Sequence, residues 1–202
     1  MEQFLKFGFD LDNTLINYSH AVQEYCKISR ISDVRTIDGL RSTLRRQDSA
    51  GYLWQTAQSW LYTEGLQFAV PNTGAEALCR YLKLNKYELF IVSHKTTHSP
   101  DFAGHKPLHE LATKWIMDSP LSVYFTEASS VYYEPTRESK VARIRSLKLN
   151  LFVDDLEEVF REAGFPSFTR SFLLGKTSTD ISNLRCIDTL SNIQEILENE
   201  RN

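Results

Sequence analysis

Short apolar runs alternate with helical segments along most of this 202-residue chain. Each run is bounded by polar or turn residues, as is typical of strands that are buried on both faces of a sheet. This alternation predicts parallel strands joined by right-handed helical crossovers, and hence an α/β fold, a three-layer sandwich with a central parallel sheet. The candidate strands are residues 4–9, 88–92, 122–125, 150–153, 170–174 and 184–187.

The expected helices begin at recognisable cap residues. Thr73 and Ser191 each open a capping-box pattern, with an acid or an amide three residues later. Pro107 suits the first turn of a helix, and Thr136 can cap a helix over residues 137–147. Helices are therefore expected next to most of the candidate strands.

One region interrupts the alternation directly after the first strand. Residues 15–71 contain no convincing strand and are typical of two to four helices rich in Tyr, Trp, Arg and Gln. We therefore divide the chain into an α/β core, residues 1–14 and 72–202, and a helical insert, residues 15–71. The insert is expected to lie over the end of the first strand, with Trp54 and Trp60 in its own interior.

The composition excludes several classes of protein. Lys and Arg total 23 against 26 Asp and Glu, so the basic excess of a nucleic-acid-binding protein is absent. A hydrophobic content of 42% is too high for a disordered chain. No apolar run approaches the ~20 residues that span a bilayer, and the first residues lack the basic segment of a secretory signal. Three scattered cysteines are typical of reduced thiols, so we expect a cytoplasmic protein with no membrane or nucleic-acid partner.

Two of the apolar runs end in pairs of acidic residues. The first run delivers Asp10 and Asp12, followed by Thr14, and a later run delivers Asp154 and Asp155. A solvated turn or a helix cap would explain either pair alone. Because the carboxyl ends of parallel strands form the ligand-binding crevice of α/β folds, we expect both pairs to meet there. Carboxylates brought together need a cation, and their hard oxygens suit Mg²⁺.

Two further residues fit the same crevice by their order along the chain. Ser93 follows the run at 88–92, so its hydroxyl can face the site. Lys140 is expected in the exposed first turn of the helix over 137–147, where its ammonium can reach an anion. A lone serine or lysine is usually a surface residue, so these two gain weight only from their position between the acidic pairs.

With these residues in place, the chain resembles the haloacid dehalogenase-like hydrolases. The resemblance implies a Rossmann-like core in which the first strand lies between the second and the fourth, and it makes the insert a helical cap that follows the first motif. It covers roughly residues 1–14 and 72–174. It rests on four segments in the family's order: FDLDNTL at 9–15, IVSHK at 91–95, Lys140 within TRESKVARI, and FVDD at 152–155.

The resemblance implies a metal-dependent phosphoryl transfer. Asp10 would attack phosphorus and form an aspartyl-phosphate, and Asp12 would protonate the leaving oxygen and then activate water. Mg²⁺ would be held by the carboxylates of Asp10 and Asp154 and by the backbone carbonyl of Asp12. Because the dehalogenases of this family lack the second acid, Asp12 favours a phosphatase.

The same resemblance implies supporting roles around this centre. Ser93, Lys140 and Asn13 would bind the phosphate oxygens, with Lys140 acting as a point charge. Asp155 would hold a metal-bound water or cap the following helix, and Thr14 would order the first loop.

These expectations favour a Mg²⁺-dependent phosphatase that acts on a small phosphorylated metabolite, a sugar phosphate or a nucleoside monophosphate. Two alternatives stay open: a phosphomutase or phosphotransferase that uses the same aspartyl-phosphate, and a non-catalytic ligand-binding member of the family. Lys27, a lysine of the insert, also leaves open the Schiff-base chemistry of the phosphonatase branch.

Two polar clusters carry weaker signals. Four of the five histidines lie within residues 94–109, but the prolines of this segment prevent one helix from presenting them together. A polar loop at the ligand-binding edge is therefore favoured over a zinc site, and in it His94 and Lys95 could touch the substrate or the insert. The basic cluster of the insert is expected to form a solvated helix face: Arg41, Arg45 and Arg46.

Overall fold

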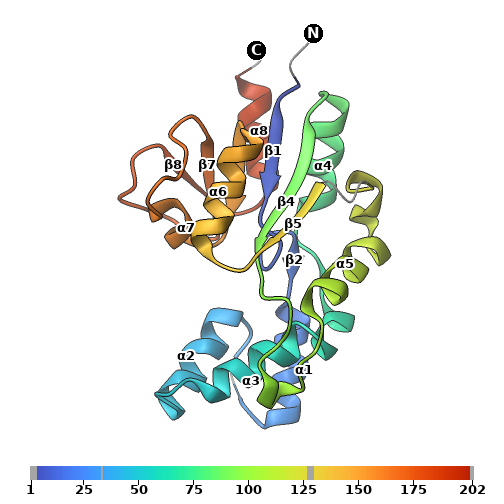
Figure 1. Cartoon of the computed structure of the whole chain (residues 1–202), viewed down its shortest axis with the longest axis vertical. Coiled ribbons are helices and arrows are strands. Elements are labelled where there is room, and N and C mark those ends of the chain that lie inside the picture. The colour runs from blue at the N-terminus through green and yellow to red at the C-terminus, as the bar shows by residue number, and fades with distance from the viewer. Residues whose placement is uncertain (1–3, 33, 127–129, 201–202) are drawn as a thin grey trace.

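The computed structural model describes residues 4–32, 34–126 and 130–200. The strands of its main sheet are β1 (Lys6–Phe9), β4 (Glu88–His94), β5 (Val131–Glu134), β6 (Leu151–Asp154), β7 (Arg170–Leu174) and β8 (Leu184–Ile187). Within the described residues these six strands form a parallel sheet in the order β5-β4-β1-β6-β7-β8 (Figure 1). The expectation that the first strand lies at the centre, here between β4 and β6, is therefore confirmed.

Helices cover both faces of this sheet. Those of the core are α4 (Ala75–Leu84), α5 (Leu108–Asp118), α6 (Arg137–Leu147), α7 (Glu157–Arg161) and α8 (Ser191–Asn199), with the 3-10 turns η2 (Asp101–Ala103) and η3 (Pro120–Tyr124). Apolar side chains of α4, α5 and α8 form a cluster with one face of the sheet, whereas α6 and α7 form a second cluster with the other face. Successive residues of β6 alternate between the two, since Val153 belongs to the first and Phe152 to the second. The expected three-layer, Rossmann-like sandwich is thus confirmed.

Gly8 allows the central strand to pack closely against Leu149 and against Phe152 of β6. A Cβ atom at this position would lie 2.3 Å from Cδ1 of Leu149 and 2.8 Å from Cδ2 of Phe152, closer than carbon atoms can approach. Because glycine has no side chain, β1 and its neighbours close without a clash. Asp10, which follows β1, therefore lies near the middle of the edge that the carboxyl ends of the strands form.

The helical insert leaves and rejoins the core through a short antiparallel ribbon. Its elements are β2 (Ile16–Asn17), α1 (Ser19–Ser29), α2 (Ile37–Gln47), α3 (Tyr52–Leu61), η1 (Glu64–Phe68) and β3 (Val70–Pro71). β2 pairs with β3, so the expectation of no strand in residues 15–71 is wrong at both ends. Strands of two residues carry no periodic pattern, which is why the sequence did not indicate them. Figure 1 shows the insert beyond the carboxyl ends of β1 and β4.

The insert shares one hydrophobic core with the sheet. Trp54 of α3 and Leu40 of α2 belong to the same buried cluster as Phe9 of β1. Trp60 and Phe68 pack against this cluster, and their rings stack with centroids 6.2 Å apart. The expected aromatic interior is present but is continuous with the core. The division of the chain into residues 1–14 and 72–202 on one side and 15–71 on the other stays a prediction.

The candidate strand at residues 122–125 is wrong. These residues lie largely in η3, because Ser119 accepts a hydrogen bond from the Leu121 N–H and Pro120 occupies the first position of the turn. The strand that pairs with β4 at this edge is β5, whose sequence VYYE is β-branched and aromatic.

The predicted capping pattern is realised in part. Thr136 caps α6 as expected and accepts a hydrogen bond from the Ser139 N–H at 3.1 Å. α4 and α8 begin without a side-chain cap, so the boxes predicted at Thr73 and Ser191 do not form. At α4 the cap position is taken by Gly74, whose φ of 81° is open to glycine without strain.

The three cysteines are not joined by disulfide bonds. Cys26, Cys79 and Cys186 are free thiols, and burial raises the pKa of Cys79 to about 12, so this thiol is an inert core group at neutral pH. In the described part of the chain, none of the helices combines the length and the apolar character that crossing a membrane would require.

Candidate active site

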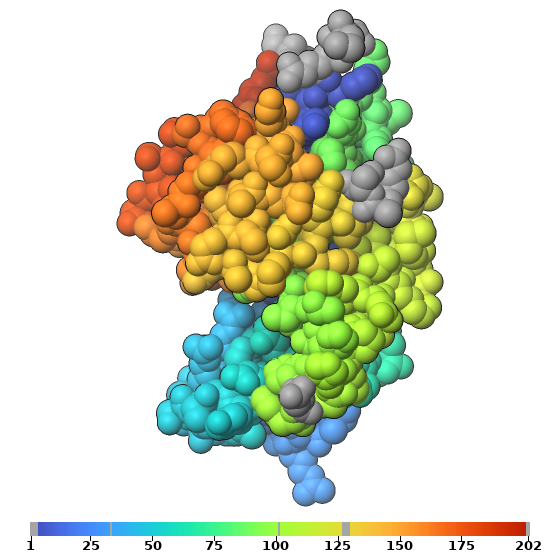
Figure 2. Space-filling model, viewed as in Figure 1, coloured from blue at the N-terminus to red at the C-terminus, as the bar shows by residue number. Residues whose placement is uncertain are grey.

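The acidic residues lie where the carboxyl ends of β1 and β6 face the helical insert. Asp10 follows β1 directly, and its backbone N–H donates to the carbonyl oxygen of Val153 at 2.9 Å. Asp154 is the last residue of β6 and is fully buried. Figure 2 shows an indentation of the surface between α2 and α3 of the insert and α6 and α7 of the core. The fold thus brings the two acidic pairs to one place.

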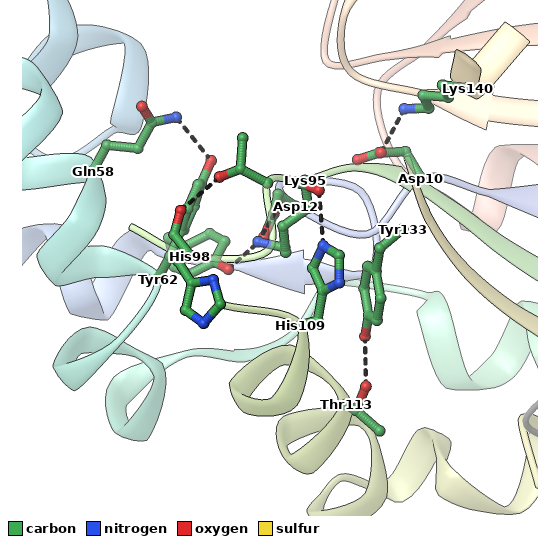
Figure 3. Close-up of polar contacts among 12 residues, drawn as sticks. Asp10, Asp12, Gln58, Tyr62, Lys95, His98, His109, Thr113, Tyr133 and Lys140 are labelled. Atoms are coloured by element: carbon green, nitrogen blue, oxygen red, sulfur yellow. Dashed lines mark hydrogen bonds and ion pairs between the residues drawn. The ribbon is translucent and has the colours of Figure 1, made fainter. Parts of the chain in front are cut away.

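Lys140 joins the two acidic pairs. Its Nζ lies 2.6 Å from Oδ1 of Asp10 and 2.6 Å from Oδ2 of Asp154. Figure 3 shows the contact with Asp10. The residue is only 1% exposed, so the expectation of an exposed position is wrong. From the start of α6, Lys140 reaches Asp10, which follows β1, and Asp154, the last residue of β6, and both of these partners are themselves buried. Although burial acts against the charge, the two carboxylates raise the pKa of Lys140 above its ordinary value, and it stays an ammonium ion.

Asp10 is in an unfavourable position for a negative charge. Its pKa is raised to about 7, because burial and the carboxylates of Asp154 and Asp12 raise it and Lys140 offsets only part of this effect. Burial and the nearby Asp154 also raise the pKa of Asp155 well above its usual range. The basic side chains of the protein therefore do not fully neutralise the carboxylates of this site.

The acidic cluster fits a divalent cation. In the described part of the chain, the carboxylate oxygens of Asp10, Asp154 and Asp155 form a group within 4.8 Å of one another. When all four carboxylates of Asp10, Asp12, Asp154 and Asp155 are ionised, the two ammonium groups that contact them among the described residues, Lys95 and Lys140, leave two negative charges unbalanced. One divalent cation would balance them, and oxygen ligands of this kind suit Mg²⁺.

The two acids of the second pair differ in their partners. Oδ1 of Asp154 accepts a hydrogen bond from the Leu156 N–H at 3.0 Å, while Oδ2 contacts Lys140. Asp155 is half-buried and lines the cleft. Because α7 begins at Glu157 without a side-chain cap, the idea that Asp155 caps this helix is wrong. Which of the two acids binds a metal directly stays a prediction.

Asp12 is held by Tyr18 and Lys95, and the sequence analysis gave neither residue this role. The Tyr18 hydroxyl donates to Oδ1 at 2.6 Å, and Nζ of Lys95 lies 2.7 Å from Oδ2. Burial and the neighbouring Asp12 raise the pKa of Tyr18 well above its usual range, so its hydroxyl keeps its proton. Nζ of Lys95 also lies 4.1 Å from the ring centre of Tyr62, so Lys95 does touch the insert. Strand alternation was the available signal, because it places Lys95 on the same face as Ser93.

The loop after β1 is held by Asn72, which the sequence analysis did not single out. The Asn72 amide donates to the carbonyl oxygens of Asn13 and Thr14 at 3.0 and 3.1 Å. Asn13 has a left-handed backbone with a φ of 62°, a conformation that asparagine tolerates. Oγ1 of Thr14 is buried and has no hydrogen-bond partner among the described residues. Thr14 is therefore enclosed in this loop, and Asn72 fixes the loop backbone.

Ser93 lies near the carboxyl end of β4 but is 1% exposed. Its Oγ has no hydrogen-bond partner in the described part of the chain. A buried hydroxyl that lacks a partner costs free energy. Ser93 is therefore a candidate to bind a group that the protein itself does not supply.

A cleft of about 320 Å³ connects the acidic residues with the insert. From the predicted site it is lined by Asp10, Asp12, Asn13, Lys140 and Asp155. From the insert it is lined by Arg41, Gln55, Gln58, Ser59 and Tyr62. Arg41, which was expected on a solvated face, instead contributes to the cleft and stacks on Trp54, with its guanidinium carbon 4.9 Å from the ring centre. Asp154, Ser93 and Thr14 are buried and do not line this cleft.

The histidine-rich segment forms a polar loop and the start of α5, as expected. The rings of His98 and His105 stack with centroids 4.3 Å apart. Nε2 of His109 bonds with the carbonyl oxygen of Lys95 at 2.9 Å, and the His109 ring stacks on Tyr133 with centroids 4.6 Å apart (Figure 3). One of these histidines therefore supports a residue of the site.

Comparisons with known proteins show which fold this chain has. No protein-family model and no curated protein matches the chain. A haloacid dehalogenase-like hydrolase of Streptococcus pneumoniae is similar with a TM-score of 0.62 and 14% identity over 97% of this chain and 100% of that one. A predicted phosphatase of Clostridium acetobutylicum has a TM-score of 0.62 and 16% identity over 97% and 100% of the two chains. A HAD-hydrolase of Bacillus subtilis, bound to magnesium, has a TM-score of 0.57 and 16% identity over 97% and 99%. The chain therefore has the fold of the haloacid dehalogenase-like hydrolases, as its motifs predicted.

Proposed function

We propose that this protein is a metal-dependent phosphatase that hydrolyses a small phosphomonoester. The observation that carries the proposal is that Lys140 and Asp154, which lie far from Asp10 and Asp12 in the sequence, meet these two acids beside the cleft. The similar fold of a predicted phosphatase supports the same class of reaction.

The chemistry follows from Asp10 and Asp12. A carboxylate oxygen of Asp10 attacks phosphorus while the bond to the leaving oxygen breaks, which forms an aspartyl-phosphate. Asp12 donates a proton to the leaving oxygen in this step. A water molecule then attacks phosphorus and gives its proton to Asp12, and the bond between Asp10 and phosphorus breaks to release inorganic phosphate.

The carboxylates of Asp10 and Asp154 and the backbone carbonyl of Asp12 would hold Mg²⁺, with Asp155 close enough to take part. Bound Mg²⁺ supplies positive charge that offsets the crowded carboxylates and the phosphate. Lys140 keeps its charge beside Asp10 and stabilises the negative charge that develops on the phosphoryl group.

Ser93, Asn13 and Lys140 are proposed to bind the phosphate oxygens. The unpartnered hydroxyl of Ser93 supports this role, as does the position of Asn13 in the wall of the cleft. The side chain of Thr14, which is fully buried in the loop between Asp12 and the insert, is proposed to order this loop through its packing.

The helical insert is proposed to act as a cap that selects the substrate. It supplies Arg41, Gln55 and Gln58 to the cleft that begins at the catalytic carboxylates. A volume of about 320 Å³ and these polar groups suit a small metabolite, and we propose a sugar phosphate or a nucleoside monophosphate in the cytoplasm. Lys27, which Schiff-base chemistry would require inside the cleft, has a side chain that is 70% exposed and paired with Glu24.

Release of inorganic phosphate from a panel of phosphorylated metabolites tests the proposal. Activity is expected with Mg²⁺, should vanish with EDTA and should return when Mg²⁺ is restored. Ca²⁺ should fail to support turnover, because its longer bonds and looser coordination misplace the phosphoryl group. Full activity in chelator would contradict the metal assignment. Relocation of phosphate within a bisphosphorylated sugar would favour the phosphomutase alternative, and no turnover of any substrate would favour a ligand-binding protein.

A further inference from the structure

Lys95 carries a buried ammonium group that the proposed chemistry does not use. Its Nζ lies 2.7 Å from Oδ2 of Asp12, and its side chain is 3% exposed. The ring centre of Tyr62 lies 4.1 Å from the same Nζ, so the cation is enclosed between a carboxylate and an aromatic face. A lysine confined in this way has given up the rotamer freedom of a surface lysine. Lys95 can therefore hold the carboxylate of Asp12 in one place.

The backbone of Lys95 is fixed on two sides. Its N–H donates to the carbonyl oxygen of Glu134, at the end of β5, at 2.9 Å. Its own carbonyl oxygen bonds with His109, whose ring stacks on Tyr133, and the Tyr133 hydroxyl lies 3.0 Å from Oγ1 of Thr113. Figure 3 shows these contacts leading from α5 to the site. The lysine side chain thus projects from a well-supported point of the loop.

Tyr18 completes the arrangement from the other side. Its hydroxyl donates to Oδ1 of Asp12 at 2.6 Å, so each carboxylate oxygen has one donor. Two donors determine the rotamer and the plane of the carboxylate. Each oxygen still has a second lone pair, which leaves room for a leaving group or a water molecule.

We propose that Lys95 is a positioning residue for Asp12, and that α5 supports it through His109. The inference rests on the proposed function, because that function gives Asp12 its role in proton transfer. Proton transfer requires heavy atoms about 2.6–3.2 Å apart, so a carboxylate that rotates freely is out of reach for much of the time. A buried ion pair with a structural role alone would stabilise the fold and would not change the relative rates of different substrates.

Two substrates that differ in their leaving group separate these roles. Glycerol 3-phosphate needs a proton on its leaving oxygen, whereas p-nitrophenolate leaves without one. Lys95→Met is expected to lower kcat for glycerol 3-phosphate about 10- to 100-fold, with little change in KM. With p-nitrophenyl phosphate the same variant should release one nitrophenolate per site rapidly and then turn over slowly, because the second step still needs Asp12. Equal losses for both substrates without this burst would overturn the proposal.

A double-mutant cycle gives an independent measurement. If Lys95 acts through Asp12, the combined Asp12→Asn and Lys95→Met variant should be no slower than Asp12→Asn alone. Multiplied losses would mean independent roles and would overturn the proposal. Lys106→Met is the matched control, because Lys106 belongs to the same loop and pairs with Glu64 of the insert. Its kcat should stay within about twofold of the wild type.

Melting temperatures accompany each measurement. If Lys95→Met does not fold at the assay temperature, Lys95→Gln, which keeps a donor for Asp12, should fold and show the same pattern with a smaller loss. An Asp12→Asn variant as active as the wild type would refute the proposed function itself. An inactive Asp12→Asn together with a fully active Lys95→Met would refute only the role of Lys95.

Discussion

Asp10 and Asp12 are two residues apart in the sequence, but they lie in different surroundings. Asp10 contacts Lys140 and is crowded by Asp154, all within the core, and its pKa is raised to about 7. Asp12 contacts Lys95 from the loop after β4 and Tyr18 from the helical insert. The proposed nucleophile is thus built into the sheet, whereas the proposed acid–base group lies at the boundary between core and insert. Changes in the core should therefore affect the chemistry of every substrate, and changes in the insert should affect substrates differently.

The largest effect is expected from Asp10→Asn. An amide occupies the same volume but cannot attack phosphorus, so phosphate release should fall by roughly 10⁴-fold or more while the fold is retained. Steady-state phosphate release and circular dichroism measure the two properties. Retention of more than a trace of wild-type activity would show that another residue is the nucleophile.

Lys140→Met should damage stability as well as catalysis. Removal of the ammonium leaves the buried Asp10 and Asp154 without their partner, which is expected to lower the free energy of unfolding by about 3–5 kcal/mol in the absence of metal. Urea unfolding with and without Mg²⁺ measures this loss, and Mg²⁺ should restore part of it. An unchanged free energy of unfolding would contradict the buried contacts.

Asp10 should make the stability of the metal-free protein depend on pH. Its pKa is raised from 3.8 to about 7, so the folded state holds this proton more tightly than the unfolded state. The resulting stabilisation is complete below about pH 4 and is lost as the pH rises through 7. The free energy of unfolding of the wild type relative to Asp10→Asn should therefore fall over this range in EDTA. A constant difference would show that Asp10 is already ionised throughout.

A Mg²⁺ titration separates the two acids of the second pair. Asp154→Asn should raise the Mg²⁺ concentration for half-activity about 10- to 100-fold, because a charged ligand is lost. Asp155→Asn should have a smaller effect, measured under the same conditions. The opposite result would make Asp155, which belongs to the same oxygen cluster, the direct ligand.

The smallest effects are expected in the insert. Arg41 lines the cleft, whereas Arg45 of the same helix is exposed, so Arg41→Ala and Arg45→Ala form a matched pair. Arg41→Ala should change kcat/KM by several-fold for some substrates of a panel and leave others unchanged, because Arg41 lines the insert side of the cleft and is proposed to contact the leaving group rather than the phosphate. Arg45→Ala should leave all of them within about twofold. A uniform loss across the panel for Arg41→Ala would contradict the division between core and cap.

Sequence reasoning predicted the candidate site best at positions where a strand ends in charged residues. The acidic pairs at Asp10 and Asp154 each follow a run of apolar residues, and a parallel sheet brings the carboxyl ends of such runs to one edge. It failed for residues 122–125, where the apolar composition of SVYF resembles a strand but Ser119 and Pro120 favour a 3-10 turn. An apolar run without neighbours does not show whether it pairs or turns.

The amino-acid sequence by itself determined five of the six strands of the main sheet, the helices that follow the first strand, and the residue types that gather at the sheet edge. These follow from local periodicity and from the order of the motifs along the chain. Only the tertiary structure decided that Lys140 is buried, that Lys95 and Tyr18 hold Asp12, and that Arg41 faces the cleft. Burial and hydrogen bonding depend on which distant segments pack together. Local sequence patterns do not show which segments these are, so they do not predict those contacts.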